Sequence, residues 1–261
     1  MDTNPVYEFL ASPDHDLMDG VWRLEVGEGE DRIAPDTRCE IIFHLAEPPL
    51  EKTATDWIRQ PARMIYGPLT RVLELGRTSP MSLMAIRLKP HAIGALTEYP
   101  REFRNRSSDL TALFSTFIID ELSKAAHVDL QYFSQTAQSA LKATGTVGNK
   151  AARVAEAVEV LELEPAMGPL ELATRMIVSR RTLDRNFMRH TGLTPGEFLQ
   201  IHRYHAARKA IRAGAGSLSA IAQDAGYADQ AHMTREFRRF AGKTPRHKRG
   251  DDPSDIFYDE G

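Results

Sequence analysis

The spacing of apolar side chains changes along the chain and divides it into a strand-rich beginning and a helical remainder. Before residue 90, short segments rich in β-branched and aromatic residues are separated by turns that carry Gly or Pro. These segments are VWRLEV (21–26), CEIIFHLA (39–46), RVLEL (71–75) and SLMAIRL (82–88). Several short strands at this spacing predict an all-β sandwich or barrel over about residues 1–90.

From Pro90 the apolar spacing becomes helical, and residues 91–143 are predicted to be a helical segment. In DLTALFSTFIIDELSKAAH (109–127), Asp109 is a candidate N-cap. The residues that follow it form one apolar stripe: Leu110, Leu113, Phe114, Phe117, Ile118 and Leu122. A second helix is predicted from Asp129 to about Ala143. The stripe is apolar over more than three turns, so we expect it to form a dimer contact; the alternative is that it caps its own barrel.

A linker, TGTVGNK (144–150), precedes a region that is helical almost throughout and contains an internal repeat. Shifting the chain by 50 residues places Arg-x-Phe-x-Arg and Gly-x-Thr-Pro of 185–195 on the same residues of 235–245. Earlier in each copy, Leu172-Ala173 matches Ile221-Ala222 with a shift of 49. The second copy therefore has one extra residue in its turn, for which Ala228 is the candidate. Each copy is predicted to be a helix-turn-helix.

The second helix of each copy has an apolar face and a polar face. Leu183 and Phe187, like Met233 and Phe237, lie four residues apart and are expected to point inward. At 100° per residue the opposite face carries Arg181, Asp184 and Arg185 in the first copy and Gln230, Ala231, His232 and Arg235 in the second. Such side chains near a helix N-terminus can reach base edges in a major groove. An amphipathic helix with a solvated face is the alternative, and the repetition of the pattern argues against it.

One continuous helix, PGEFLQIHRYHAARKAIRAG (195–214), is predicted between the copies. It is expected to carry Phe198, Ile201, Ala206 and Ile211 inward and Arg203, Arg208, Lys209 and Arg212 outward. A rigid helix of this length would hold two DNA-reading helices about one helical turn of DNA apart.

Charge supports a polyanionic partner for the helical region. The net charge is −3, but residues 168–250 contain 16 Lys and Arg against 6 Asp and Glu, and the rest of the chain is acidic. The tail DDPSDIFYDEG (251–261) is acidic and is expected to be flexible. The N-terminus lacks the order of a secretory signal and no apolar run suits a membrane helix, so we expect a cytoplasmic protein without membrane contact.

The repeat, the connecting helix and the endings GLTP (192–195) and GKTP (242–245) resemble the DNA-binding domain of the AraC/XylS family of transcription regulators. The segment IAQDAGYADQAHMTREFRRFAGKTP resembles the family's second unit most closely; the first unit has Ile177 where the second has Gly226. The resemblance implies that the seven polar-face residues above contact bases, Ala231 reaching only a thymine methyl group. Residues assigned to the DNA backbone are Ser179, Arg180, Arg203, Lys209, Arg239 and Lys243.

The resemblance also implies a fold and partners. It predicts an α+β multidomain protein with a cupin-like sensor and dimerisation domain (1–147) and an all-α DNA-binding domain (148–250). The expected partners are double-stranded DNA, RNA polymerase, a second copy of the chain and an unidentified small-molecule effector bound within residues 1–100. The same resemblance favours a transcriptional activator. The effector, the operator and the choice between activation and repression stay open.

Little in the sequence favours an enzyme. The phosphate-loop, nucleophile-elbow and His-Glu-x-x-His motifs are all absent. His202 and His205 have a spacing that metals can use, but no nearby carboxylate or cysteine completes a site, so we expect neither a metal nor a cofactor. Cys39 fits core packing better than redox sensing. The alternative function is a small β-barrel enzyme or ligand-binding protein whose basic tail binds nucleic acid without specificity.

Overall fold

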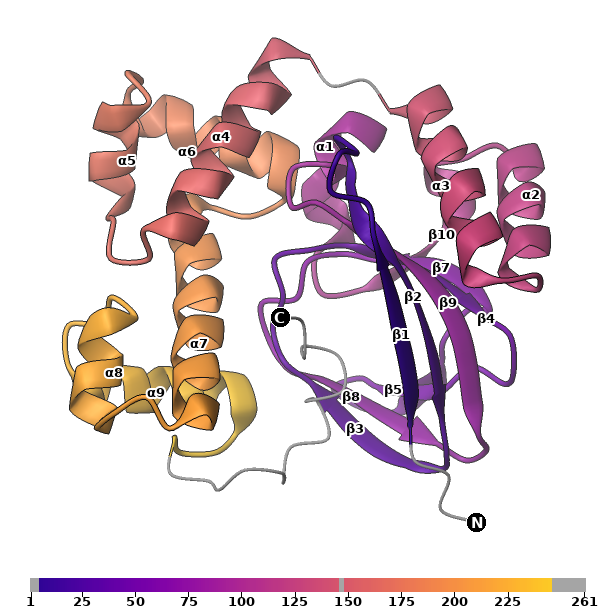
Figure 1. The fold of residues 1–261 in the computed structure, drawn as a ribbon, viewed down its shortest axis with the longest axis horizontal. Helices are drawn as coiled ribbons and strands as arrows, with labels where there is room; N and C mark the ends of the chain where they lie inside the picture. The colour runs from indigo at the N-terminus through magenta and orange to yellow at the C-terminus, as the bar shows by residue number, and fades with distance from the viewer. Residues whose placement is uncertain (1–4, 146–147, 246–261) are drawn as a thin grey trace.

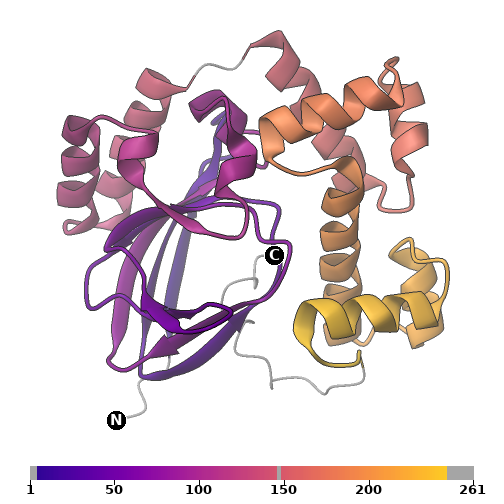
Figure 2. The same cartoon turned by 180° about the vertical axis from the view of Figure 1, so that it is seen from behind.

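The computed structural model describes residues 5–145 and 148–245, and the predicted acidic tail lies outside them. Figure 1 shows a strand-rich N-terminal part (residues 5–145) beside a helical C-terminal part (residues 148–245). The long helix α7 connects an upper and a lower group of helices in the C-terminal part, and the view from behind in Figure 2 shows the same arrangement. No helix in the described ranges is long and apolar enough to cross a membrane.

The N-terminal part contains two antiparallel sheets. The larger has the strand order β1 (Val6–Ala11), β2 (Met18–Val26), β9 (Met81–Leu88), β4 (Glu40–His44), β7 (Arg63–Tyr66) and β10 (Ser107–Asp109). The smaller has the order β3 (Gly29–Ile33), β8 (Leu73–Arg77), β5 (Leu50–Lys52) and β6 (Trp57–Arg59). The four segments found in the sequence overlap β2, β4, β8 and β9. The remaining strands are short or carry charged residues, which weakens their alternation.

These sheets do not form the closed cupin-like barrel that the resemblance implies. Strand pairing within the described residues ends at β1 and β10 in one sheet and at β3 and β6 in the other, and no ladder of paired strands joins the two. The arrangement is therefore two open sheets packed face to face.

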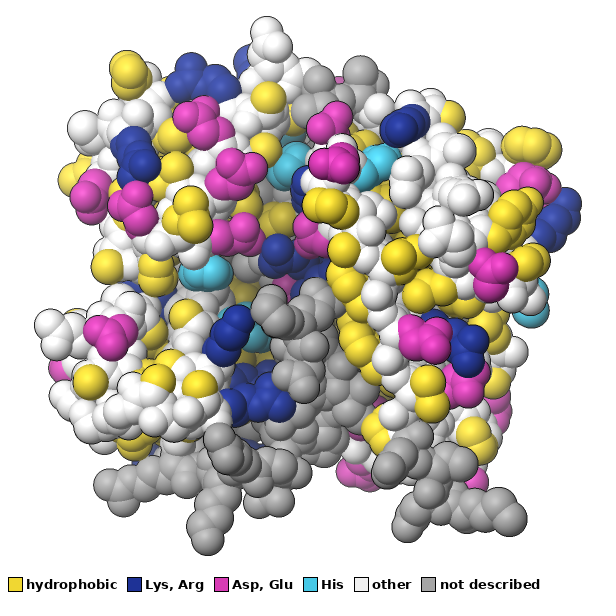
Figure 3. Space-filling model, viewed as in Figure 1, with side chains coloured by type: hydrophobic (Ala, Val, Ile, Leu, Met, Phe, Trp, Pro, Cys, Tyr) yellow, Lys and Arg dark blue, Asp and Glu magenta, His cyan; other side chains and the backbone are white. Residues whose placement is uncertain are grey.

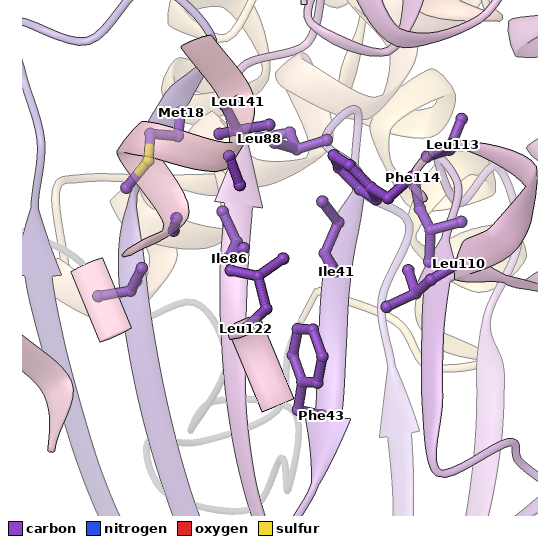
Figure 4. Close-up of a cluster of buried hydrophobic side chains, with 14 of the residues drawn as sticks. Met18, Ile41, Phe43, Ile86, Leu88, Leu110, Leu113, Phe114, Leu122 and Leu141 are labelled. Atoms are coloured by element: carbon purple, nitrogen blue, oxygen red, sulfur yellow. The ribbon is translucent and has the colours of Figure 1, made fainter. Parts of the chain in front are cut away.

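The larger sheet is buried on both faces in its centre. Along β9, Met84, Ile86 and Leu88 pack toward the helices that follow the sheet, whereas Leu83 and Ala85 belong to the cluster on the other face. This alternation follows from the two-residue period of a strand. Figure 4 shows the helix-side cluster, in which residues of β2, β4 and β9 meet residues 110–141.

The single helix predicted from Asp109 is wrong in its bounds and in its apolar face. Asp109 caps a short 3₁₀ helix, η2 (Leu110–Ala112), and Ser115 then caps α2 (Thr116–Ala126). This break rotates the later residues, so Phe117 is 72% exposed while Ile119 and Leu122 are buried. The early stripe residues cover the chain's own larger sheet, which is the alternative left open above. The following helix, α3 (Leu130–Thr144), is as predicted.

The C-terminal part consists of helices in the order expected from the repeat. They are α4 (Asn149–Leu163), α5 (Pro169–Arg175), α6 (Arg180–Thr191), α7 (Pro195–Ala213), α8 (Leu218–Asp224) and α9 (Gln230–Ala241). One hydrophobic cluster joins them, and Ala34 of the N-terminal part belongs to it. Two short elements of the N-terminal part, α1 (Ile93–Leu96) and the 3₁₀ helix η1 (Pro100–Phe103), pack against α6.

Candidate nucleic-acid interface

The two copies of the repeat have the same geometry. The first helices, α5 and α8, have seven residues each, and the second helices, α6 and α9, have twelve each. Gly192 and Gly242 end α6 and α9 in the left-handed conformation, with φ values of 72° and 67°. Glycine is favoured there because it has no Cβ. The internal repeat is therefore a repeat of structure as well as of sequence.

The turns of the two units show where the displacement between the copies changes from 49 to 50 residues. Val178 N donates to the carbonyl of Ala173, and Tyr227 N donates to that of Ala222, each pair being displaced by 49 residues. Both turns also contain a left-handed residue, Ile177 with φ 53° and Gly226 with φ 80°.

The N-caps that follow the turns are displaced by 50. Ser179 Oγ accepts from Thr182 N, and Asp229 Oδ1 accepts from His232 N. The extra residue thus lies between Tyr227 and Asp229, so it is Ala228, as the sequence indicates.

Apolar contacts orient the two second helices. Leu183 and Phe187 are buried on α6, and the ring of Phe187 meets Phe198 of α7 edge-on at 6.0 Å between centroids. On α9, Met233 and Phe237 are buried, and Phe237 lies 4.9 Å from Tyr204 of α7. Because α7 contacts both inner faces, it fixes both helices in one rigid unit.

The arginines of the polar faces are exposed. Arg181, Arg185 and Arg235 lie on the surface and make no hydrogen bond or ion pair with another described residue. Ala231 is also exposed. These side chains are accessible to a ligand as large as a duplex.

The other three polar-face residues are partly engaged. Asp184 is half-buried and accepts a hydrogen bond of 2.8 Å from Arg180 one turn earlier. His232 lies 3.8 Å from Glu236 and meets the ring of Tyr227 edge-on. Gln230 is half-buried at the start of α9. Any base contact by Asp184 or His232 must compete with these intramolecular contacts.

Glu236 is a residue that the sequence reasoning missed. It lies on the buried side of α9, and burial raises the pKa of its carboxyl despite opposing contributions from Tyr227 and His232. Burial also raises the pKa of the Tyr227 hydroxyl, and the carboxylate of Glu236 raises that pKa further. The signal was present, since Glu236 lies three residues after Met233 and therefore about 60° from it around the helix, at the edge of the apolar face. Tyr227 and Glu236 therefore both lie against the side chain of His232.

The residues assigned to the DNA backbone lie in different environments. Ser179, Arg180, Lys209 and Arg239 are exposed, and Lys243 is half-buried. Arg203 does not point freely outward, because it is half-buried and its Nε donates to the carbonyl of Pro165 at 2.7 Å. The outward placement of Arg208 is wrong, since that residue is 8% exposed. On the same helix His202 contacts Glu162 of α4 and His205 contacts Pro35, and sequence spacing could not reveal such contacts.

An ionic network beside the larger sheet joins the two parts of the chain. Arg87 binds Asp36 at 2.7 Å, and Arg38 binds Asp19 at 2.5 Å. Arg38 also reaches Glu162 of α4 at 3.3 Å. Burial alone would raise the pKa of Asp36, but Arg87 and Arg38 hold it below its ordinary value. In the space-filling view of Figure 3, charged side chains of both signs lie in the hollow between the two parts.

The histidine pair of α7 contacts backbone rather than a metal-ligand set. His202 Nε2 lies 3.0 Å from the carbonyl oxygen of Glu162, and His205 Nε2 lies 2.7 Å from that of Pro35. Across the described ranges, no three His, Cys, Asp or Glu residues gather as metal ligands would. The pair thus ties α7 to α4 and to the N-terminal part.

Two matching helix-turn-helix units joined by α7 form a double helix-turn-helix arrangement, which is typical of DNA-binding proteins. Comparisons with known proteins agree. Residues 172–251 match a helix-turn-helix domain family, and residues 13–109 match a domain of unknown function, DUF6597. The C-terminal part is therefore similar to the helix-turn-helix domains of AraC-type transcriptional regulators.

Two relatives are similar in sequence over about a third of this chain. The chain is 41% identical over 75 residues to the HTH-type transcriptional activator RhaS of Escherichia fergusonii, a match to 29% of this chain and 27% of that protein. It is 34% identical over 94 residues to a putative AraC-like transcription regulator of Streptomyces antibioticus, covering 35% and 31%. The chain thus spans about a third or less of the length of these relatives.

Over the whole chain, the solved structure of ToxT from Vibrio cholerae O395 is similar at 9% identity with a TM-score of 0.47, covering 97% of this chain and 98% of that one. A likeness this distant carries no argument about function.

Proposed function

We propose that this protein is a sequence-specific transcription regulator that binds double-stranded DNA through α6 and α9. The observation that carries the proposal is the equivalence of Arg185 and Arg235, one in each unit, both exposed and without a partner among the described residues. An arginine can donate two hydrogen bonds to guanine O6 and N7, a contact worth about 1–3 kcal/mol of discrimination.

The connecting helix supports two reading helices in successive major-groove segments. With 19 residues, α7 is about 28 Å long at 1.5 Å per residue. One turn of B-DNA is about 34–36 Å, and a connecting helix of similar length supports the proposal that α6 and α9 bind successive major-groove segments on one face of a duplex. The capping box of Thr194 and Glu197 fixes the beginning of this helix.

The test is selection of bound fragments from random DNA, followed by Arg185→Ala and Arg235→Ala. Each variant should lose its base preference in one half of the site, at positions about one helical turn apart, and keep the other half. Lys209→Ala on the exposed side of α7 is the matched control and should at most weaken binding equally on all sequences. If both arginine variants lower affinity uniformly, they are backbone contacts and the base assignment is wrong.

The residue assignments beyond these two arginines belong to the same proposal. Arg181, Asp184, Gln230, Ala231 and His232 are the remaining candidate base contacts. The domain division near residues 147 and 148, RNA polymerase as a partner and action in the cytoplasm also stay proposals. Transcription reconstituted with purified polymerase on a selected site would show whether the protein activates or represses.

We place a small effector between the two sheets. A cavity of about 80 Å³ lies there, with apolar walls from Leu73, Leu75 and Leu83 and polar groups that include His44. Trp22 lines it and donates through Nε1 to Glu40 at 2.9 Å. Such a mixture suits a ligand of only a few heavy atoms unless the sheets move apart. Quenching of Trp22 fluorescence by a metabolite panel tests this, with Trp57→Phe removing the other tryptophan signal.

The homodimer proposal now depends on a smaller surface. Phe117 and Val128 remain 72% and 63% exposed on and after α2, and Tyr132 of α3 is 48% exposed. Sedimentation of the full chain at tens of micromolar should show a dimer that Phe117→Asp dissociates. A wild-type monomer at that concentration contradicts the proposal.

A further inference from the structure

The facing surfaces of the two sheets do not form one continuous core. Two separate hydrophobic clusters lie there, one formed by β2 and β9 and the other mainly by β7 and β8. The cavity of about 80 Å³ lies between them, because Trp22 and Leu83 of the first cluster and Leu73 and Leu75 of the second line it. Most of the surface that the cavity exposes is apolar. Protein interiors rarely contain a space larger than a water molecule, so this gap is a candidate ligand site.

The charged side chains at the cavity are already paired. Among the described residues, those that line it are Asp36, Arg38, Glu40 and Arg87. Arg87 binds Asp36 at 2.7 Å and Glu40 at 2.8 Å, and these three side chains are between 12% and 17% exposed. Arg38 binds Asp19 at 2.5 Å. A charged ligand would have to separate one of these pairs, and an unpaired charge in a protein interior is strongly destabilising.

Three neutral donors at the cavity also have acceptors. Trp22 Nε1 donates to Glu40 at 2.9 Å, and the Tyr66 hydroxyl donates to Glu51 at 2.7 Å. Gln60 Nε2 donates to Glu51 as well, at 3.0 Å. Because these donors are occupied, a ligand rich in hydroxyl or amine groups would bury polar groups of its own without partners.

His44 lines the cavity as a neutral ring. Burial lowers its pKa from 6.5 to about 4, although a hydrogen-bonding contribution from Gln60 opposes the change. Both ring nitrogens are buried, so they are not accessible to a ligand in the cavity. The ring therefore adds neither a charge nor an exposed polar atom to the wall.

We infer that the cavity binds an uncharged, mainly apolar molecule and not a charged or polyhydroxylated metabolite. The inference rests on the proposed effector site, whose ligand class it specifies. Such a ligand gains free energy by leaving water, and it leaves every ion pair of the wall intact.

The volume of the cavity limits the size of the ligand. An engineered apolar cavity of roughly 150 Å³ stays dry and accommodates benzene or xenon. The space between the sheets is about half as large, so it suits a chain of about three or four heavy atoms.

The experiment compares three probes that share a three-carbon chain, in the full chain with Trp57→Phe at pH 7. Propan-1-ol is neutral, propionate is an anion and propylammonium is a cation. Sodium chloride keeps the ionic strength equal in the three titrations. Trp22 is 5% exposed and lines the cavity, so its fluorescence reports occupancy.

We expect propan-1-ol to give a saturable change in Trp22 fluorescence and to bind at least about tenfold more tightly than either ion. Leu75→Phe should abolish this binding with no loss of melting temperature, because the larger side chain fills the space. Ile58→Phe is the matched control and should bind propan-1-ol as the unmodified site does. It enlarges an aliphatic residue of the same sheet, is 57% exposed, and is not among the described lining residues.

Tighter binding of either ion, abolished by Leu75→Phe, would overturn the ligand class while leaving the site in place. Unchanged propan-1-ol binding in Leu75→Phe also overturns the inference, because the probe would then bind elsewhere. A flat response to all three probes contradicts both the inference and the proposed effector site. None of these results bears on α6 and α9, which the DNA selection tests separately.

Ile33→Phe provides a second filling variant. Ile33 is half-buried on β3 and also lines the cavity. If Leu75→Phe does not fold, loss of propan-1-ol binding in Ile33→Phe, with binding retained in Ile58→Phe, decides the question in the same way.

Discussion

The two turns of the repeat have the same left-handed conformation at one position but carry different residues there, Ile177 in the first and Gly226 in the second. Ile177 has φ 53° and is 89% exposed, so its side chain gains little from burial. A left-handed conformation costs an L-residue about 1–2 kcal/mol, and a β-branched residue is especially unsuited to it. Ile177→Gly removes this cost, but glycine adds about 0.4–1 kcal/mol of conformational freedom to the unfolded chain. The variant should be more stable by about 0.5–1 kcal/mol.

Gly226→Ala should act in the opposite direction and more strongly. Its φ is 80°, and a Cβ there would lie 2.6 Å from Pro165 O and 2.8 Å from Ala166 Cα. Both neighbours are backbone atoms, which cannot rotate away as a side-chain end can. The left-handed cost and the steric conflict together predict a loss of at least about 2 kcal/mol.

Scanning calorimetry of the full chain measures both variants. One kcal/mol shifts the melting temperature by about 2–4 °C in a protein of this size, so Ile177→Gly should add about 1–4 °C and Gly226→Ala should remove about 4 °C or more. The double variant should show the sum, since the two turns lie in different units. A lower melting temperature for Ile177→Gly would refute the reasoning, because it would mean that the isoleucine makes a stabilising contact in the left-handed turn.

Two further predictions concern buried titratable groups. Burial lowers the pKa of His205 from 6.5 to about 4, so the unfolded chain binds a proton first as pH falls. The neutral ring therefore contributes its full stability above pH 6.5 and loses it toward pH 4, a change of up to about 3 kcal/mol. The free energy of unfolding, measured in urea between pH 4.5 and 7, should depend less steeply on pH for His205→Gln than for the wild type. An equal pH dependence for the two proteins would contradict the prediction. Burial raises the pKa of the Cys39 thiol, with Glu40 and Asp36 adding to the effect, so iodoacetamide at pH 8 should modify it only as fast as the protein unfolds. Rapid modification of the folded protein would contradict this.

The helix-turn-helix units could be predicted from the sequence because their signals are local. N-caps at Ser179 and Asp229, glycines at 192 and 242, and apolar pairs four residues apart each determine structure within one or two turns of helix. Repetition then separated a real motif from a chance pattern. Even the extra residue Ala228 followed from comparing the two shifts, since both turns make the same backbone hydrogen bonds.

Predictions from residue spacing were wrong where contacts with residues distant in sequence decide whether a side chain is buried. The stripe from Leu110 to Leu122 has helical spacing, but it is not one continuous helix, because α2 begins only after its N-cap at Ser115. The early residues of the stripe pack on the larger sheet. Arg208 has the spacing of an outward residue, yet it is buried on α7. The open sheets likewise depend on which strands pair, and pairing is a contact between distant residues that hydrophobic alternation cannot specify.

The sequence by itself therefore determined the helices of the helix-turn-helix units, their caps and the faces that their side chains occupy, because these follow from spacing and short-range hydrogen bonds. Only the tertiary structure decided what lies between the two parts of the chain. The network of Asp36, Arg38 and Glu162 arises from residues far apart in sequence. Their burial and charge depend on packing, and packing is a property of the whole fold.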